Sequence, residues 1–549
     1  MADPGEPVRS AVGAREAWPV LPIIGYVLLF ALLPVALLFS QGLWVGGGAG
    51  WIDSLTQSPL NRQAFENSLE QGSLSAVLAV AIGYPAGVFL GRYTWPGRSA
   101  VRAFLLVPFL LPSIVVVLGI LDLFGPSGTV SSAVPAFGVL GHGLPAIVAA
   151  NLLFNVPIVI LFTALGCESA SPELEETAAT LGAGPARAYR DVWGPGSWLG
   201  AAAGGFLTFL FSAVAFATPL VLCGARCYTV EARIWYLDQY GFDPTGAALL
   251  ALALFLFLVI PTAIYLVLLH RLRSSSSSVR TRPRPGRVRS PLAYALAAET
   301  IALLGAVAFF LGTVLYRSLS PPGGGTFGAP WTELFGPTAT NLLGIPLVQV
   351  LANTLFFAAV AATIVLLLGI VAGYALGARP RLGTGLSLYL FLPLLISPVL
   401  LAFSLAEFWR PVLGGESTVW ILIIVSQSIL ALPFALLSLQ IPLAGLSPTA
   451  RDSARVLGAP AWIAYLDTDL PQVRRGLLTA GLFAFALGLG EFTATYFLVT
   501  PNFTTLSVAV YDLQDLRQFP LAEAAAGLLL LVSLAVFAAV NYGGHRAEL

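Results

Sequence analysis

Lysine is absent from this sequence of 549 residues, in which all 27 basic residues are arginine. A nucleotide-binding loop of the Walker type needs a lysine to reach the phosphates, so the chain cannot itself be an ATPase of that kind. Any ATP that it uses must therefore bind to another subunit. We expect no enzyme and no cofactor in this chain.

Cysteine is also scarce, with Cys167, Cys223 and Cys227 as its three residues. They do not make a metal-binding set, and the sequence contains no recognisable Ser/His/Asp or Cys/His arrangement for hydrolysis. Neither a metal site nor a catalytic site is expected. Cys223 and Cys227 could pair if their loop faces an oxidising compartment, but we expect two free thiols.

Charged residues make up only 10% of the sequence, whereas apolar residues make up 57% and the mean hydropathy is +0.86. A soluble domain has no use for so much apolar surface, so we predict an all-α polytopic membrane protein. The first apolar run is too long for a signal-peptide core and is expected to be retained. Twelve runs are long enough to cross a bilayer, near 18–39, 70–91, 101–123, 144–166, 199–222, 246–269, 293–315, 351–377, 384–407, 419–440, 476–499 and 521–541.

The arginines are distributed unevenly between the loops that join these runs. If the N-terminus is cytoplasmic, 21 arginines lie in inner segments and 6 in outer segments. Because arginine accumulates on the cytoplasmic side of membrane proteins, we predict this orientation in the cell membrane. The segment 271–292 carries seven arginines and five consecutive serines, which is typical of a flexible linker.

One polar segment occurs twice at an offset of 276 residues, in predicted loops at about 171–196 and 447–472. The glycine follows the acid by 6 residues and the proline follows the glycine by 13 in both copies. The first copy is Glu176, Ala178, Gly182 and Pro195, and the second is Asp452, Ala454, Gly458 and Pro471. The arginine distribution predicts that both loops are cytoplasmic.

The repeat extends beyond these loops. Asn67-Ser68 at the head of the second apolar run matches Asn353-Thr354 at the head of the eighth, at an offset of 286. We therefore predict two tandem six-helix halves with the same orientation, at 1–270 and 293–549, joined by the linker 271–292.

Local chemistry predicts a short helix-turn-helix in each loop. Ser171 and Ser447 are suited to cap a helix whose first residue is a proline. Gly182 and Gly458 suit a chain reversal with positive φ. Pro195 and Pro471 then open the next apolar run. An ordinary cytoplasmic loop is the alternative for one copy, but two copies in register argue against it.

Polar side chains inside the apolar runs are candidates for a solute pathway. Glu491 is the most prominent, and its alternative role is a bond to a neighbouring helix. Asn151 and Asn155 share one face of the fourth run, where hydrogen bonds between helices are the competing interpretation. Prolines interrupt the third and ninth runs and could free carbonyl groups, namely Pro108, Pro112, Pro393 and Pro398.

The repeated segments resemble the EAA loop of ABC-importer permeases, whose pattern is Glu-Ala-Ala, three residues, glycine and a distal proline. The departures are Thr177 for the first alanine, and Asp452 and Ser453 in the second copy. The resemblance implies that each loop carries a coupling helix that sits in a cleft of a cytoplasmic ATPase. It assigns the coupling role to the eight acid, alanine, glycine and proline residues of the two copies.

Two such loops in one chain resemble the fused permeases of type I ABC importers, the thiamine and ferric-iron permease family. The resemblance implies two copies of an ATPase subunit and an extracytoplasmic solute-binding protein as partners, and thiamine as the solute, with ferric iron as the alternative. Segments around Asn155, 240–244 and 490–506 are closer to the thiamine branch. An ion-coupled secondary transporter is the rival class, but it would want several intramembrane acids and needs no paired cytoplasmic loops. A membrane-embedded enzyme is a more distant rival.

Overall fold

The computed structural model describes residues 20–48, 50–170, 172–276, 286–287, 290–320, 326–378, 386, 389–444, 446 and 448–545. The regular elements within these residues are helices, apart from the two-residue strands β1 (Tyr93–Thr94) and β2 (Gly286–Arg287), which pair in parallel. Ten of the described helices are long and apolar enough to cross a membrane, and up to 12 spans result if each of two bent pairs counts as one. The prediction of an all-α polytopic membrane protein is confirmed.

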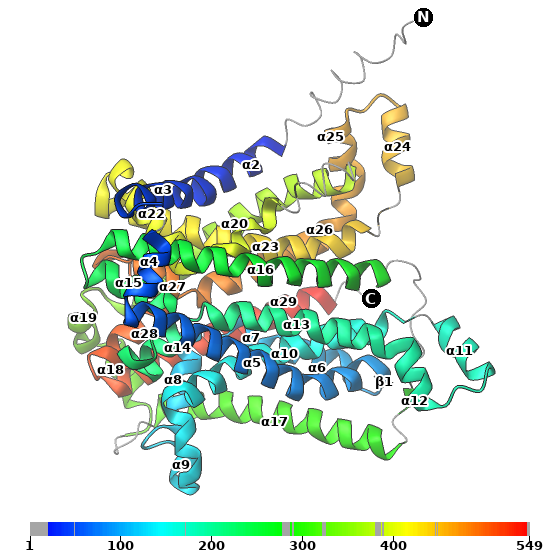
Figure 1. The fold of residues 1–549 in the computed structure, drawn as a ribbon, viewed down its shortest axis with the longest axis horizontal. Helices are drawn as coiled ribbons and strands as arrows, with labels where there is room; N and C mark the ends of the chain where they lie inside the picture. The colour runs from blue at the N-terminus through cyan, green and yellow to red at the C-terminus, as the bar shows by residue number, and fades with distance from the viewer. Residues whose placement is uncertain are drawn as a thin grey trace, which may run out of the picture. The chain divides into compact units, whose positions relative to one another are not determined.

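One compact unit comprises Gly42–Leu342 and Ala509–Leu531. Its long helices α5, α10 and α13 pack against one another and run side by side (Figure 1). The principal helices are α5 (Pro59–Arg92), α8 (Ser113–Phe124), α10 (Gly143–Glu168), α13 (Gly194–Ala213), α16 (Pro244–Ser276) and α17 (Pro291–Leu319). The shorter ones are α4 (Gly50–Gln57), α6 (Arg98–Phe104), α7 (Val107–Leu110), α9 (Thr129–Ala133), η3 (Pro135–Gly141), α14 (Ala217–Leu222), η5 (Gly224–Cys227), α15 (Val230–Gln239), α18 (Ala329–Leu334) and α19 (Pro337–Leu343).

The other compact unit comprises Met1–Gln41, Leu343–Val508 and Val532–Leu549. Its core lies between α20, α23 and α26, where alanine, valine and leucine side chains are buried. Its elements are α2 (Leu21–Val27), η2 (Leu28–Leu32), α3 (Leu33–Gly46), α20 (Leu347–Ala378), η6 (Leu392–Leu395), α22 (Pro398–Leu413), η7 (Gly415–Thr418), α23 (Val419–Ala444), α26 (Leu470–Gly490), α27 (Thr493–Leu498) and η9 (Pro501–Phe503). Two further helices, α28 (Leu506–Asp515) and α29 (Phe519–His545), are divided between the two units.

The first helix of each predicted half belongs to the compact unit that is built mainly from the other half. The segment from α2 to η2 packs on α20, α22 and α23. There the Tyr26 hydroxyl lies 2.5 Å from the Ser428 hydroxyl, and Tyr389 donates a hydrogen bond of 2.7 Å to the Ile24 carbonyl. In the other unit, α17 packs on α5 and α8. The compact units therefore exchange their first helices. The division of the chain into two six-helix halves stays a prediction from the sequence repeat.

Glycines at every fourth position let α5 approach α10 closely. A methyl group on Gly87 would lie 2.5 Å from the Thr163 side chain, and one on Gly91 would lie 2.5 Å from Cys167. Small residues at this spacing bring two membrane helices into backbone contact, where van der Waals packing replaces the hydrophobic effect. This tight pair fixes the end of α5, which is important for the site described below.

Residues related by the internal repeat make equivalent hydrogen bonds in the two units. Asn67 donates to the Tyr228 carbonyl at 3.1 Å, and Asn353 donates to the Thr504 carbonyl at 3.2 Å. The next residues repeat the correspondence, because the Val230 amide donates to Ser68 at 3.0 Å and the Leu506 amide donates to Thr354 at 2.8 Å. The matched Asn-Ser and Asn-Thr pairs thus hold equivalent loops.

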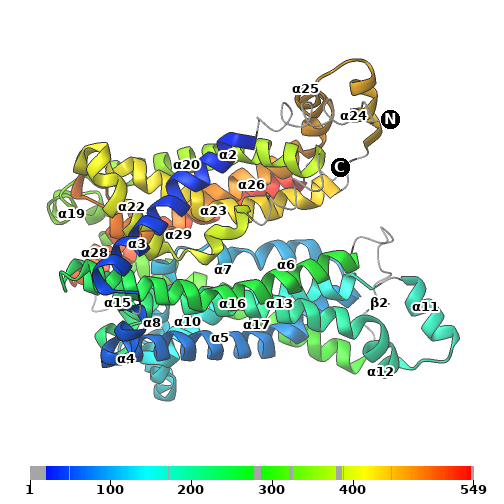
Figure 2. The same ribbon diagram turned by 45° about the horizontal axis from the view of Figure 1, so that its top comes forward.

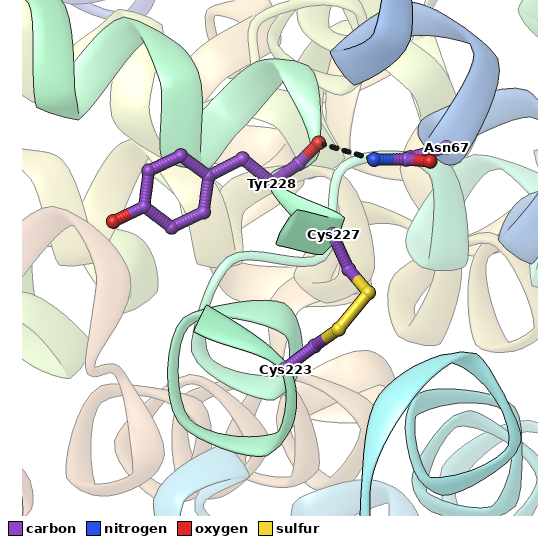
Figure 3. The surroundings of a disulfide bond; sticks show 4 residues. All are labelled: Asn67, Cys223, Cys227 and Tyr228. Atoms are coloured by element: carbon purple, nitrogen blue, oxygen red, sulfur yellow. Dashed lines mark hydrogen bonds between the residues drawn. A yellow bond between two sulfur atoms is a disulfide. The ribbon is translucent and has the colours of Figure 1, made fainter. Parts of the chain in front are cut away.

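Cys223 and Cys227 form a disulfide next to this loop (Figure 3). The expectation of two free thiols is therefore wrong. No local pattern predicts the bond, because the cysteines are four positions apart and the η5 turn is what brings their sulfurs together. Cys167 is free and buried.

Candidate functional site

The two predicted loops fold alike. In the first, α11 (Pro172–Thr180) is followed by α12 (Pro185–Ala188) and the π-helical turn η4 (Tyr189–Trp193). In the second, α24 (Pro448–Val456) is followed by α25 (Ala461–Ala464) and the π-helical turn η8 (Tyr465–Asp469). Every one of these bounds differs by 276 residues between the copies. Each loop projects beyond the long helices of its own unit (Figure 2). Ser171 and Ser447, the predicted caps, lie outside the described residues.

Glycine closes the first helix of each loop in the same way. Gly182 has φ of 77° and Gly458 has φ of 95°, as predicted. The amide of Ala183 donates to the Ala178 carbonyl at 2.9 Å, and the amide of Ala459 donates to the Ala454 carbonyl at 3.0 Å. This is the Schellman pattern, in which a left-handed residue turns the chain and satisfies the last carbonyls of the helix. The repeated alanine and glycine therefore set the shape of the loop.

The hydroxyl residues that depart from the EAA pattern serve the helix. Thr177 donates to the Glu173 carbonyl at 2.7 Å, and its counterpart Ser453 donates to the Thr449 carbonyl at 2.9 Å. Both bonds run back by four residues, an arrangement in which a small hydroxyl residue fits a helix. Glu176 and Asp452, the preceding acids, are exposed.

Large apolar side chains are exposed on these otherwise polar loops. Leu181 is 79% exposed, and its counterpart Leu457 is 88% exposed. Leu174 and Val456 are exposed as well. Both loops therefore repeat an exposed leucine directly before the glycine of the turn.

The return arm of each loop, which is its short second helix with the π-helical turn, is hydrogen-bonded to a long helix of the same unit at an equivalent position. The hydroxyls of Tyr189 and Tyr84, on α5, are 2.8 Å apart. In the second copy, Tyr465 donates to the Ile370 carbonyl of α20 at 3.1 Å. Positions 84 and 370 are related by the offset of 286. Pro195 and Pro471 are each the second residue of the helix that follows, α13 and α26, as expected.

Asn151 and Asn155, the first two pathway candidates, are buried in α10. Asn151 donates to Ser75 of α5 at 3.2 Å, which is a hydrogen bond between helices. Asn155 donates to the Asn151 carbonyl at 2.7 Å. These contacts supply a structural role for both side chains, and their place in a solute pathway stays a prediction.

Glu491, the third candidate, lies at a break between α26 and α27 rather than deep in a continuous helix. One carboxylate oxygen accepts from the Ala494 amide at 2.7 Å, and the other accepts from the Thr495 amide at 2.8 Å. The carboxylate thus satisfies amides at the start of α27, where a negative charge is favourable. The equivalent break in the first half falls between α13 and α14, at Ala215, which has no carboxylate.

Two further acids in apolar helices were not predicted as site residues. Asp122 of α8 and Glu523 of α29 are both buried and interact electrostatically with each other and with Arg317 of α17. Arg317 also donates to the Ser127 carbonyl at 2.8 Å. The three residues lie in three different helices, so the sequence has no local pattern that joins them.

The proline breaks fall where they were predicted. Pro112 caps the start of α8 after a break from α7, and its counterpart Pro398 opens α22 after η6. The segments on the two sides of the second break are bent by 100°. Proline removes a backbone donor and clashes with the preceding turn, which explains both breaks.

The long apolar helices define a multi-pass membrane protein. Residues 83–274 match the sequence model of the family described as "Binding-protein-dependent transport system inner membrane component". Over these residues the chain is similar to the inner membrane components of that family.

Several similar proteins are named as permeases. The "Thiamine transport system permease protein ThiP" of Salmonella typhimurium is 26% identical over 95% of this chain and 96% of its own length. The protein of the same name from Escherichia coli is 25% identical over 85% of this chain and 86% of its own length. The "Molybdenum transport system permease protein ModB" of Mycobacterium bovis is 28% identical over 43% of this chain and 88% of its own length. A permease of that length thus corresponds to about half of this chain.

Proposed function

We propose that this chain is the transmembrane permease subunit of an ABC importer, coupled through its two loops to a separate ATPase. The observation that carries the proposal is the pair of matched loops, each with the same glycine turn and an exposed leucine beside it. A short helix with exposed apolar side chains is suited to lie in a groove of another protein. Two such helices call for two ATPase subunits.

The partners follow from this arrangement. The ATP binds to the two ATPase subunits, because this chain has no lysine with which to build a Walker loop. An extracytoplasmic binding protein delivers the solute to the side opposite the loops. Closure of the ATPase pair on ATP moves the coupling helices, and the helices attached to them reorient the solute site.

The orientation has the N-terminus and both loops in the cytoplasm. The arginine distribution favours this arrangement. The Cys223–Cys227 disulfide supports it independently, because disulfides persist in oxidising compartments outside the cytoplasm. In unit Gly42–Leu342, the disulfide follows α14 at the end of the helices opposite α11 (Figure 1).

The solute is thiamine. The support is that the two ThiP relatives cover 95% and 85% of the chain, including both halves, whereas the molybdenum permease covers 43%. Ferric iron is the alternative that the fused architecture admits. An ion-coupled transporter would need neither loop.

The test is reconstitution of the chain with the ATPase and the binding protein encoded beside it. We expect two ATPase subunits per chain and uptake of radiolabelled thiamine that requires ATP. The double variant Leu181→Arg with Leu457→Arg should lose the ATPase on purification while remaining inserted in the membrane. Val139→Arg, at an exposed apolar residue outside the loops, is the matched control and should keep it.

Three results would contradict the proposal. Uptake driven by an ion gradient without nucleotide would favour the secondary transporter. Retention of the ATPase by the double arginine variant would remove the loops from the interface. ATP-dependent uptake of ferric iron or molybdate, but not of thiamine, would leave the architecture and overturn the solute.

A further inference from the structure

Arg92, the last residue of α5, contacts both the first helix, α11, and the π-helical turn, η4, of the first loop. Its two terminal nitrogens bind the two carboxylate oxygens of Glu175 on α11, with Nη2 donating to Oε2 at 3.1 Å. Its guanidinium also lies over the Trp193 ring on the return arm, with Cζ 4.8 Å from the ring centroid. Arg92 and Glu175 are about one-quarter exposed or less. The end of a transmembrane helix is therefore joined directly to a coupling helix.

This contact is suited to transmit movement. An arginine that binds a carboxylate through two nitrogens fixes orientation as well as distance. Stacking on an indole ring restrains the same guanidinium from its other side. Since α5 is packed tightly on α10 through Gly87 and Gly91, a displacement of α11 would be passed into the packed helices of this unit.

The second loop has a different ion pair at the same positions. Arg451 of α24 stands where the first copy has Glu175, and Asp469 stands where it has Trp193. Their side chains form an ion pair of 2.6 Å between Nε and Oδ2, with Arg451 12% exposed and Asp469 fully buried. The counterpart of Arg92 is Ala378, which carries no charge. In this copy the ion pair therefore joins one arm of the loop to the other arm.

We infer that the two coupling loops transmit movement to their long helices in different ways. Arg92 is a positioning residue through which a displacement of the first loop moves α5. The Arg451–Asp469 pair preserves the shape of the second loop, which reaches its long helix through Tyr465. This inference rests on the proposed function, because it assigns unequal mechanical roles to two loops that bind the same ATPase.

The test measures thiamine transported per ATP hydrolysed in proteoliposomes with the ATPase and the binding protein. Arg92→Ala should lower this ratio about tenfold, within the usual range of coupling between linked sites, while ATPase binding and hydrolysis persist. The charge exchange Arg92→Glu with Glu175→Arg should restore at least half of the ratio. A residue that served folding alone would not change this ratio while leaving hydrolysis intact.

Two comparisons complete the experiment. The double variant Arg451→Ala with Asp469→Ala removes both charges, so no unpaired buried charge remains. It should weaken ATPase binding, and hydrolysis and transport should fall together with the ratio unchanged. Arg62→Ala, in the exposed Arg62–Glu66 pair at the other end of α5, is the matched control and should leave all three quantities unchanged.

The outcomes separate the two claims. An unchanged ratio in Arg92→Ala, or an equal fall of the ratio in the Arg451/Asp469 variant, would overturn the inference of unequal loops and leave the proposed function intact. Failure of the charge exchange to restore the ratio would also contradict it. A wild-type chain that transports without nucleotide would overturn the proposed function and this inference with it.

Discussion

The hydroxyl oxygen of Tyr189 lies 2.8 Å from the hydroxyl oxygen of Tyr84. These two residues are 105 positions apart, on the π-helical turn of the first loop and on the long helix α5. The second copy makes the corresponding connection with one tyrosine, since Tyr465 donates to the Ile370 carbonyl. The same contact is thus built from a side chain in one half and from the backbone in the other.

Removal of the tyrosine hydroxyl from the π-helical turn should lower the stability of the protein more in the second copy than in the first. Tyr465→Phe removes the hydrogen bond from a fully buried tyrosine to the Ile370 carbonyl, and such a bond contributes about 0.5–1.5 kcal/mol. In Tyr189→Phe, Tyr84 keeps a partner, because it also lies 2.9 Å from the Ser197 hydroxyl. We expect a larger fall in thermal unfolding temperature for Tyr465→Phe, measured in detergent. Equal falls, or a larger one for Tyr189→Phe, would contradict this account.

Substitution of the two turn glycines should be limited by backbone conformation and not by lack of space. A methyl group on Gly182 or Gly458 would meet no atom within 4 Å, so the cost of substitution comes from positive φ, about 1–2 kcal/mol for an ordinary residue. Gly182→Val with Gly458→Val should therefore uncouple transport while the protein remains inserted. Asparagine tolerates this conformation, so Gly182→Asn with Gly458→Asn is the matched control and should retain most of the transport. Wild-type transport by the valine variant would refute the role of the turn.

The helices and the two loops could be predicted from the sequence, because the patterns that indicate them are local or repeated. Hydropathy defines the helices, and Gly182 and Gly458 predict their own positive φ. The ion pair of Arg92 with Glu175 could not be predicted, because no sequence pattern relates two residues that are 83 positions apart. The exchange of first helices and the Asp122–Glu523 contact were missed for the same reason. They depend on which helices pack together, and apolar runs look alike.

Glu491 should stabilise the start of α27. Its carboxylate accepts three hydrogen bonds within four residues, one of them from the Thr495 hydroxyl at 2.5 Å. Loss of such a helix-capping acceptor costs about 1 kcal/mol, so Glu491→Ala should lower the unfolding temperature. Glu491→Gln keeps one acceptor and should lower it less.

The same pair of variants tests the predicted pathway role of Glu491. If the carboxylate attracts a cationic solute, Glu491→Gln should raise the KM for thiamine several-fold with little change in stability. An unchanged KM would leave Glu491 as a capping residue alone. Ala215→Glu, at the equivalent break of the first half, is a useful converse because it adds a carboxylate where the repeat has none.

The disulfide provides a direct test of orientation. In intact cells, a membrane-impermeant maleimide should fail to label the chain until an impermeant reductant is added outside, and should then add two labels. Cys167 is buried, so Cys167→Ser should leave this result unchanged, whereas Cys223→Ser with Cys227→Ser should abolish it. Labelling only after the membrane is opened would place Cys223 and Cys227 on the cytoplasmic side. That result would contradict the arginine-based topology and would put both coupling loops outside the reach of a cytoplasmic ATPase.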